Sequence, residues 1–382
     1  MLEPLAASDW DRNKAAHLLK RAGFGSTPSE LDAWSKLSLQ EAVNKLVDWE
    51  STPDPTPDPE WAQPGFGLPI SDRAELAKLS QEQRKELFQE YQRLQRSQIQ
   101  ELREDWLTRM AKTPRPLQEK MTLYWHGHFA TSAEKVKASY YMWKQLDLFR
   151  RLGHGSYQTL LVEVGRDPAM LIWLDGAQSK RSSPNENYAR ELMELFTLGE
   201  GHYTEQDIKE SARAFTGWDV QRFEQKARYV PQRYDGGQKT FLGETGAFRD
   251  EDIVRIILKQ DQASRYLATK LWTFFAYENP EPELIQDLAG TLRGEKWELK
   301  PVLKKIFLSR AFYSPRCLMA QIKSPVRLVD RHSKKSRNHP LPPPPQHHHP
   351  RSAWSEPPPT TQRQRLGRRT HLDQHHHSHA AP

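Results

Sequence analysis

The sequence predicts a mainly α-helical protein that forms one large domain. Apolar residues recur at helical spacing in most segments between residues 9 and 309. Only residues 218–248 show the alternation and turn residues that are typical of strands. Strand and helix units do not alternate, and the glycines form neither a P-loop nor a dinucleotide fingerprint. These observations exclude a doubly wound nucleotide-binding sheet.

The first helices are short and lead into a proline-rich connector. They are expected over residues 9–22, 31–34 and 39–47, and Gly23 and Gly25 end the first of them. Residues 51–69 read STPDPTPDPEWAQPGFGLP, which predicts a connector without a regular element.

Residues 71–112 are expected to form one long polar helix, which we describe as an arm. Its apolar residues form a single narrow stripe, and Gln, Arg and Glu fill the other positions. The stripe consists of Leu79, Leu87, Tyr91, Leu94, Leu102, Trp106 and Met110. Such a helix either lies against the body or pairs with a partner. An ordinary solvated surface helix is the alternative.

Helical signals continue to residue 309, with one interruption. Asp167 and Pro168 fit the N-cap and first position of a short helix, and Thr204 with Asp207 fits the start of another. Further helices are expected near residues 115–128, 133–150, 159–164, 251–260, 262–276, 281–293 and 299–309. The interruption is an insert at 218–248, where strand-like stretches flank the hairpin turn signal Asp235-Gly236-Gly237.

The C-terminal residues 330–382 differ in composition from the rest and are expected to form a disordered tail. Residues 331–382 hold ten of the fifteen histidines, and nine Lys or Arg against Glu356 and Asp373. Such a segment cannot bury enough apolar surface to offset the entropy of ordering it. The other residues carry 47 basic and 47 acidic groups, so the body shows no overall preference for nucleic acid.

The sequence as written predicts a cytoplasmic protein without a membrane span. No run approaches the ~20 apolar residues of a transmembrane helix. The first residues lack a basic start followed by an apolar core, although export is expected if the true N-terminus lies upstream. The single cysteine, Cys317, is interpreted as a buried small residue rather than a nucleophile.

Residues 185–199, NENYARELMELFTLG, are the most informative stretch. Ser183, Pro184 and Glu186 fit a capping box, and Gly199 fits the helix end. Pairs four residues apart explain further charges, but these roles leave some amide and acidic groups unexplained. The candidate functional cluster is Asn185, Glu186, Asn187, Arg190, Glu191 and Glu194. The alternative is a buried polar network that fixes helix packing.

A second candidate site is the pair His126 and His128. In an extended segment both rings could face one metal ion, whereas on a helix they would diverge by roughly 200°. The predicted ligands of a divalent metal are His126, His128, Glu191 and Glu194, with Asp167 or Asp175 as further carboxylates. The alternative is that the histidines bond to backbone at a helix end. Trp218 is interpreted as a packing residue or, alternatively, as a residue that stacks on a ligand.

Several ordered motifs resemble a bacterial family catalogued as domain of unknown function 1800. They are HLLKRAGFG (17–25), KMTLYWHGHF (120–129), DPAMLIWLD (167–175), NENYARELMELFTLG (185–199) and YTEQDIKESARAFTGW (203–218). The resemblance covers residues 9–329 and implies a mainly helical fold. It also implies a partner from a neighbouring uncharacterised family that looks sulfatase-like. The resemblance implies no catalytic residue in this sequence.

The tail is expected to be out of frame. Codons for Gln362 to His379 can be chosen so that the second frame reads NVKGWDGGRTWINTTTL. That peptide resembles the Gly-Trp motif near the C-terminus of the same family. A frameshift near residue 330 would therefore have replaced the genuine C-terminal region.

Two classes of function fit the sequence. The first is a non-catalytic accessory or assembly protein whose helical body serves as a docking surface. The second is a metal-dependent hydrolase that uses the His and Glu residues named above. The sequence favours the first, because no group of residues meets a geometric standard for catalysis. Nucleic-acid binding would depend on the tail alone and is rejected.

Overall fold

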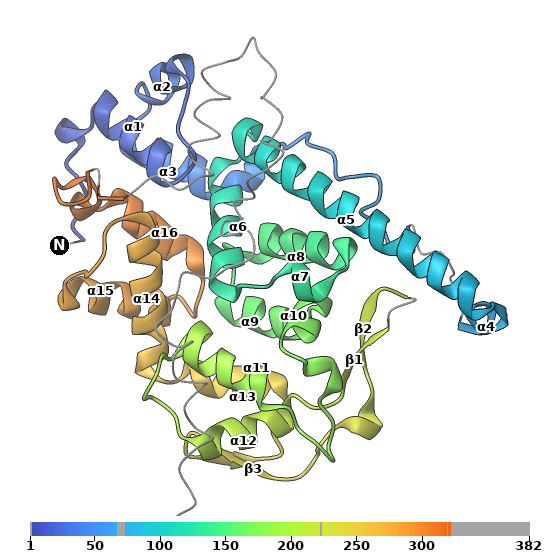
Figure 1. The fold of residues 1–382 in the computed structure, drawn as a ribbon. Helices are drawn as coiled ribbons and strands as arrows, with labels where there is room; N and C mark the ends of the chain where they lie inside the picture. The colour runs from blue at the N-terminus through green and yellow to red at the C-terminus, as the bar shows by residue number, and fades with distance from the viewer. Residues whose placement is uncertain (1, 67–72, 222–223, 319, 322–382) are drawn as a thin grey trace, which may run out of the picture.

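The computed structural model describes residues 2–66, 73–221, 224–318 and 320–321. It confirms the mainly α-helical fold, with strands confined to two small sheets within the described residues (Figure 1). No helix in these ranges is both long enough and apolar enough to cross a bilayer. The predicted tail at 330–382 and its shifted frame lie outside the described residues.

The N-terminal helices pack beside the last helix of the body. They are α1 (Arg12–Arg21), α2 (Pro28–Trp34) and α3 (Leu39–Val47). α3 packs against α16 (Leu299–Leu308). The Leu5 N–H donates to the Leu308 carbonyl at 2.8 Å, so the start of the chain runs along the end of α16.

The predicted arm consists of two helices rather than one, α4 (Arg73–Lys78) and α5 (Gln81–Lys112). The break occurs because the Ser80 side chain accepts from the Gln83 N–H and begins a new helix with a capping box. α5 extends away from the body, with α4 at its outer end (Figure 1). Near the body, Leu102, Trp106 and Met110 of α5 are buried.

A central group of helices connects the two ends of the molecule. It comprises α6 (Pro116–Phe129), α7 (Ala133–Val136), α8 (Ser139–Leu152), α9 (Tyr157–Arg166) and α10 (Pro168–Trp173). α6 and α9 both pack against α8. The predicted start of α10 is confirmed, because Asp167 caps it by accepting from the Met170 N–H at 3.0 Å.

The remaining helices complete the body below and beside this group (Figure 1). They are α11 (Glu186–Glu191), the π-helical turn η4 (Leu192–Thr197), α12 (Glu205–Ala214), α13 (Asp250–Leu258), α14 (Asp261–Phe275) and α15 (Pro282–Gly294). Thr204 and Asp207 form the expected capping box at the start of α12. Cys317 is fully buried, as interpreted from the sequence, and burial raises the pKa of its thiol to about 11.

The insert at 218–248 holds two separate hairpins. β1 (Trp218–Gln221) pairs with β2 (Lys226–Tyr229), and β3 (Lys239–Phe241) pairs with β4 (Glu244–Gly246). The predicted pairing across Asp235-Gly236-Gly237 is therefore wrong. The Asp235 side chain instead accepts from Arg213 and from the Gly237 N–H, which makes this turn a link between the two sheets.

Candidate functional site

The signature segment 185–199 lies with one face in the core. The apolar side chains of this face are almost fully buried, and they are Tyr188, Ala189, Leu192, Met193 and Phe196. The helix begins two residues later than predicted. Asn185, not Ser183, is its N-cap and accepts from the Asn187 N–H at 2.9 Å. Ser183 is used elsewhere, because it pairs with Lys180 in a tight turn.

The charged side chains of this segment are partly exposed and none is fully buried, which corrects the expectation of a buried polar network there. Arg190 donates to both Glu205 carboxylate oxygens at 2.9 Å and lies 3.6 Å from Glu186. The side chain of Arg190 is 36% exposed and that of Glu205 is 67% exposed. Glu194 accepts from the Tyr203 hydroxyl at 2.9 Å. These contacts connect the segment to α12 and to the turn before it.

The amide residues and the remaining acid of the segment have different surroundings. The Asn187 amide is exposed and donates to Asp175 at 3.5 Å. Glu191 is half-buried, and burial together with the nearby Glu194 charge raises the pKa of its carboxyl. The predicted functional role of the cluster stays a prediction.

The backbone of the segment, by contrast, is held from inside the molecule. In the π-helical turn η4 the carbonyl of Phe196 accepts from the Tyr157 hydroxyl at 2.5 Å and bonds to His128 Nε2 at 3.1 Å. The Leu195 carbonyl accepts from the Tyr266 hydroxyl at 2.7 Å. α6, α9 and α14 therefore each send one polar side chain to the same turn. π-helical turns occur frequently at functional sites.

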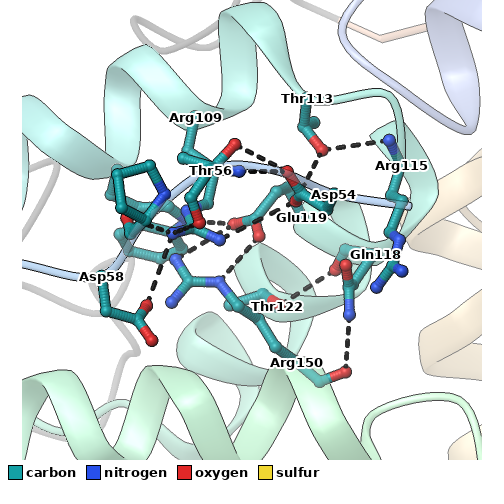
Figure 2. Close-up of polar contacts among 12 residues, drawn as sticks. Asp54, Thr56, Asp58, Arg109, Thr113, Arg115, Gln118, Glu119, Thr122 and Arg150 are labelled. Carbon is teal, nitrogen blue, oxygen red and sulfur yellow. Dashed lines mark hydrogen bonds and ion pairs between the residues drawn. The ribbon is translucent and has the colours of Figure 1, made fainter.

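The buried ionic contacts lie elsewhere, at the base of the arm (Figure 2). Arg150 of α8 donates to both carboxylate oxygens of Glu119 of α6, at 2.7 and 3.3 Å. Glu119 also accepts from the Trp106 indole N–H of α5 at 2.8 Å. The side chain of Glu119 is 0% exposed and that of Arg150 is 8% exposed. This pair thus joins three helices in the interior.

A second arginine extends this cluster to the proline-rich connector (Figure 2). Arg109 of α5 donates to the Pro57 carbonyl at 3.0 Å and to the Thr56 carbonyl at 3.3 Å. It also lies 3.8 Å from Asp54 and 3.4 Å from Asp58. No local motif in the sequence indicates this cluster, since its members come from segments up to about a hundred residues apart.

The predicted metal ligands do not form one cluster. His126 and His128 both lie on α6, where the rings diverge, and the described residues contain no group of three or more side chains suited to hold a metal ion. His126 meets the edge of Trp106, at 5.3 Å between ring centroids, whereas His128 contacts η4. Burial lowers the pKa of His126 to about 4 and that of His128 to about 3. Glu194 belongs to η4, to which His128 bonds, whereas His126 faces Trp106 of α5.

The other carboxylates named as metal ligands have partners of their own. Asp175 lies 2.9 Å from the Lys135 ammonium. Asp167 is fully buried, and burial raises the pKa of its carboxyl to about 7. It accepts from the Gln145 amide at 2.8 Å in addition to the Met170 N–H. The metal-binding role of all these residues stays a prediction, and this arrangement adds no support to it.

Trp218 lies on β1 with one ring face already in contact with a cation. The Arg166 guanidinium lies 5.3 Å from the ring centroid, and the indole N–H donates to Asp250 at 3.2 Å. These contacts favour the packing interpretation for this residue. Ligand stacking by Trp218 stays a prediction.

A polar hollow of about 740 Å³ opens beside the start of the signature segment. One wall comes from residues 177–186, and the other comes from Asp219 of β1 and from Arg233 in the short 3-10 turn after β2. Two residues of the predicted cluster, Asn185 and Glu186, line it. Glutamine, serine and lysine side chains complete a mainly polar lining, so this hollow can present both hydrogen-bond donors and acceptors to a small molecule.

Comparison with known proteins gives a family but no function. The sequence model of a family described as "Protein of unknown function (DUF1800)" matches residues 17–368. No curated protein and no solved structure matches the sequence.

Proposed function

This chain belongs to the DUF1800 family, whose function is unknown, and from that premise we propose that it is a non-catalytic accessory or assembly protein. Its helical body would hold the arm α4–α5 in a fixed direction, and the arm would dock on a partner protein. The partner that the family resemblance implies is a protein of the neighbouring sulfatase-like family.

The single observation that carries the proposal is the exposure of the outer arm. α5 is 32 residues long, which corresponds to about 48 Å at a rise of ~1.5 Å per residue. Phe88, in its outer half, is 61% exposed. An exposed phenylalanine on a projecting helix can serve as an anchor for a partner, because aromatic side chains are enriched in protein–protein interfaces.

The base of the same helix supports this interpretation. Trp106 fixes the inner half of α5 to α6 through its bond to Glu119. Arg109 fixes it to the connector (Figure 2). Further out, the Gln95 side chain accepts from the N–H of Ser139 at the start of α8 at 2.7 Å. A rigidly anchored helix loses little conformational entropy when its free end binds a partner.

The test is a binding measurement with a protein of the sulfatase-like family that the resemblance implies as the partner. The two full-length proteins would be mixed and titrated by isothermal calorimetry, with wild type compared to Phe88→Ser and to the control Gln89→Ser. Both changes place serine on an exposed position of α5, so they alter helix propensity similarly. We expect Phe88→Ser to weaken binding at least tenfold and Gln89→Ser to have little effect. Absence of binding by the wild type, or equal binding by both variants, would overturn the proposal.

A further inference from the structure

We propose that the polar hollow beside the signature segment binds a small hydroxylated molecule that carries one negative charge, such as a sugar acid. The inference does not depend on the accessory role proposed above, because it concerns different residues and a different class of ligand.

The walls of the hollow are joined to each other by backbone hydrogen bonds. The Arg181 N–H donates to the Arg233 carbonyl at 2.7 Å, and the Gly217 N–H donates to the Ser179 carbonyl at 3.4 Å. Ser183 and Lys180 exchange backbone hydrogen bonds at 2.8 and 3.3 Å. The segment 179–185 and the β1 hairpin therefore form one connected frame, and the hollow between them does not depend on loose loops.

The charges that line the hollow leave one cation without a counterion. Arg233 lies 3.3 Å from Asp219, and Glu186 lies 3.6 Å from Arg190. Lys180 lines the same hollow, and among the described residues it has no carboxylate within ion-pair distance. A ligand with one negative charge would pair with this ammonium group. A ligand with several negative charges would meet repulsion from Glu186 and Asp219.

The uncharged lining indicates a ligand rich in hydroxyl groups. Gln178 and Ser183 offer amide and hydroxyl groups that can both donate and accept hydrogen bonds. The Asn185 amide also lines the hollow, although its oxygen caps α11. The volume of about 740 Å³ is within the usual range for small-molecule sites. Most such sites are mainly apolar, so the polar lining here favours a polar ligand over a lipid or an aromatic compound.

The experiment is a calorimetric titration of the full-length protein with D-glucuronate. D-Glucose is the uncharged matched probe, and inorganic phosphate is the small anion without a carbon skeleton. We expect glucuronate to bind at least tenfold more tightly than either, because a hydrogen bond to a charged group contributes more than a neutral one. If glucose or phosphate binds as tightly as glucuronate, or if glucuronate does not bind, the proposal is wrong.

Two lysine variants locate the site. Lys180→Gln removes the unpaired cation from the hollow, whereas Lys209→Gln removes an exposed cation of α12 that does not line it. We expect Lys180→Gln to weaken glucuronate binding about tenfold or more and Lys209→Gln to leave it unchanged. Equal effects of the two changes would show that glucuronate responds to general surface charge, and this outcome would also overturn the proposal.

Discussion

Two arginines, Arg150 and Arg190, each bind carboxylates across a helix contact, but in opposite surroundings. Arg150 and Glu119 lie in the interior, with 8% and 0% of their side chains exposed. Arg190 and Glu205 lie at the surface, with 36% and 67% exposed. The distances are similar, at 2.7 Å for the first pair and 2.9 Å for the second. We infer from this difference that burial, rather than contact geometry, decides how much each arginine contributes to the free energy of unfolding.

The physical reason is the cost of separating the charges. When one member of an exposed pair is removed, water solvates the other, and the loss is typically below about 1 kcal/mol. When one member of a buried pair is removed, the other stays in a medium of low polarity without compensation. The base of the arm therefore depends on Glu119 and Arg150 in a way that the signature segment does not depend on Arg190.

The largest expected effect is that of Arg150→Ala on the free energy of unfolding. It would leave the Glu119 carboxylate buried, with the Trp106 indole N–H as its only donor within the described part of the chain, and we expect a loss of about 3–5 kcal/mol. Arg190→Ala is the matched change at the surface, with an expected loss below about 1 kcal/mol. Urea denaturation of the three full-length proteins measures both values. Similar losses for the two variants would break the comparison.

A double variant keeps this test informative if Arg150→Ala does not fold. Glu119→Gln combined with Arg150→Met removes both buried charges and keeps similar side-chain volumes. We expect it to be more stable than Arg150→Ala, because no uncompensated charge remains. If the double variant is the less stable of the two, the loss comes from packing and not from an unpaired charge.

The positions of these two arginines also show how far the sequence predicts the molecule. Local signals predicted the helices well, because caps such as Asp167 and Thr204 act within one turn. They also directed attention to Arg190, whose partner Glu186 is four residues away. Glu119 and Arg150 are 31 residues apart, and no periodic pattern indicates that they meet. The hollow is likewise formed by segments that are distant in sequence, so only its Asn185 and Glu186 side could be anticipated.

Asp167 extends the comparison of buried and exposed carboxylates, because it is buried like Glu119 but has no cationic partner in these contacts. Its hydrogen-bond donors are the neutral Gln145 amide and the Met170 N–H. Burial raises its pKa from 3.8 to about 7. Between these values the unfolded chain has lost the proton while the folded chain keeps it. The contribution of Asp167 to the free energy of unfolding therefore falls as pH rises from about 4 to about 7, and it is constant outside this window. At ~1.36 kcal/mol per pKa unit, the expected contribution is roughly 4 kcal/mol.

The Asp167→Asn variant isolates this contribution. Asparagine is an equally good N-cap but does not titrate, so the variant should lack this part of the pH dependence. We expect the difference in unfolding free energy, variant minus wild type, to grow steadily between pH 4 and pH 7 and then to stay constant. Denaturation curves at several pH values measure it. A difference that does not change with pH would show that Asp167 has the same pKa in the folded and the unfolded protein.

A smaller effect than those of Arg150 and Asp167 is expected at the backbone of the signature segment. Tyr157→Phe removes the hydroxyl that donates to the Phe196 carbonyl in η4. We expect a loss of about 1–2 kcal/mol in the free energy of unfolding, because a buried acceptor loses one of its two partners while His128 remains. Tyr124→Phe is the matched control. Its hydroxyl is also buried but has no hydrogen-bond partner among the described residues, so its removal should be neutral or slightly stabilising.

These two variants, set beside Arg190→Ala, test what holds the signature segment in place. The Tyr157 hydroxyl is enclosed in the core, and Arg190 is partly solvated. If the side chains that donate to the carbonyls of η4 hold the segment in place, Tyr157→Phe must lower the free energy of unfolding more than Arg190→Ala does. The reverse order would mean that the surface ion pairs to α12 carry the stabilisation, and the π-helical turn would then follow from them. Hydrogen exchange of the amides in 192–199 would separate the two cases, because only loss of the backbone donors should speed their exchange locally.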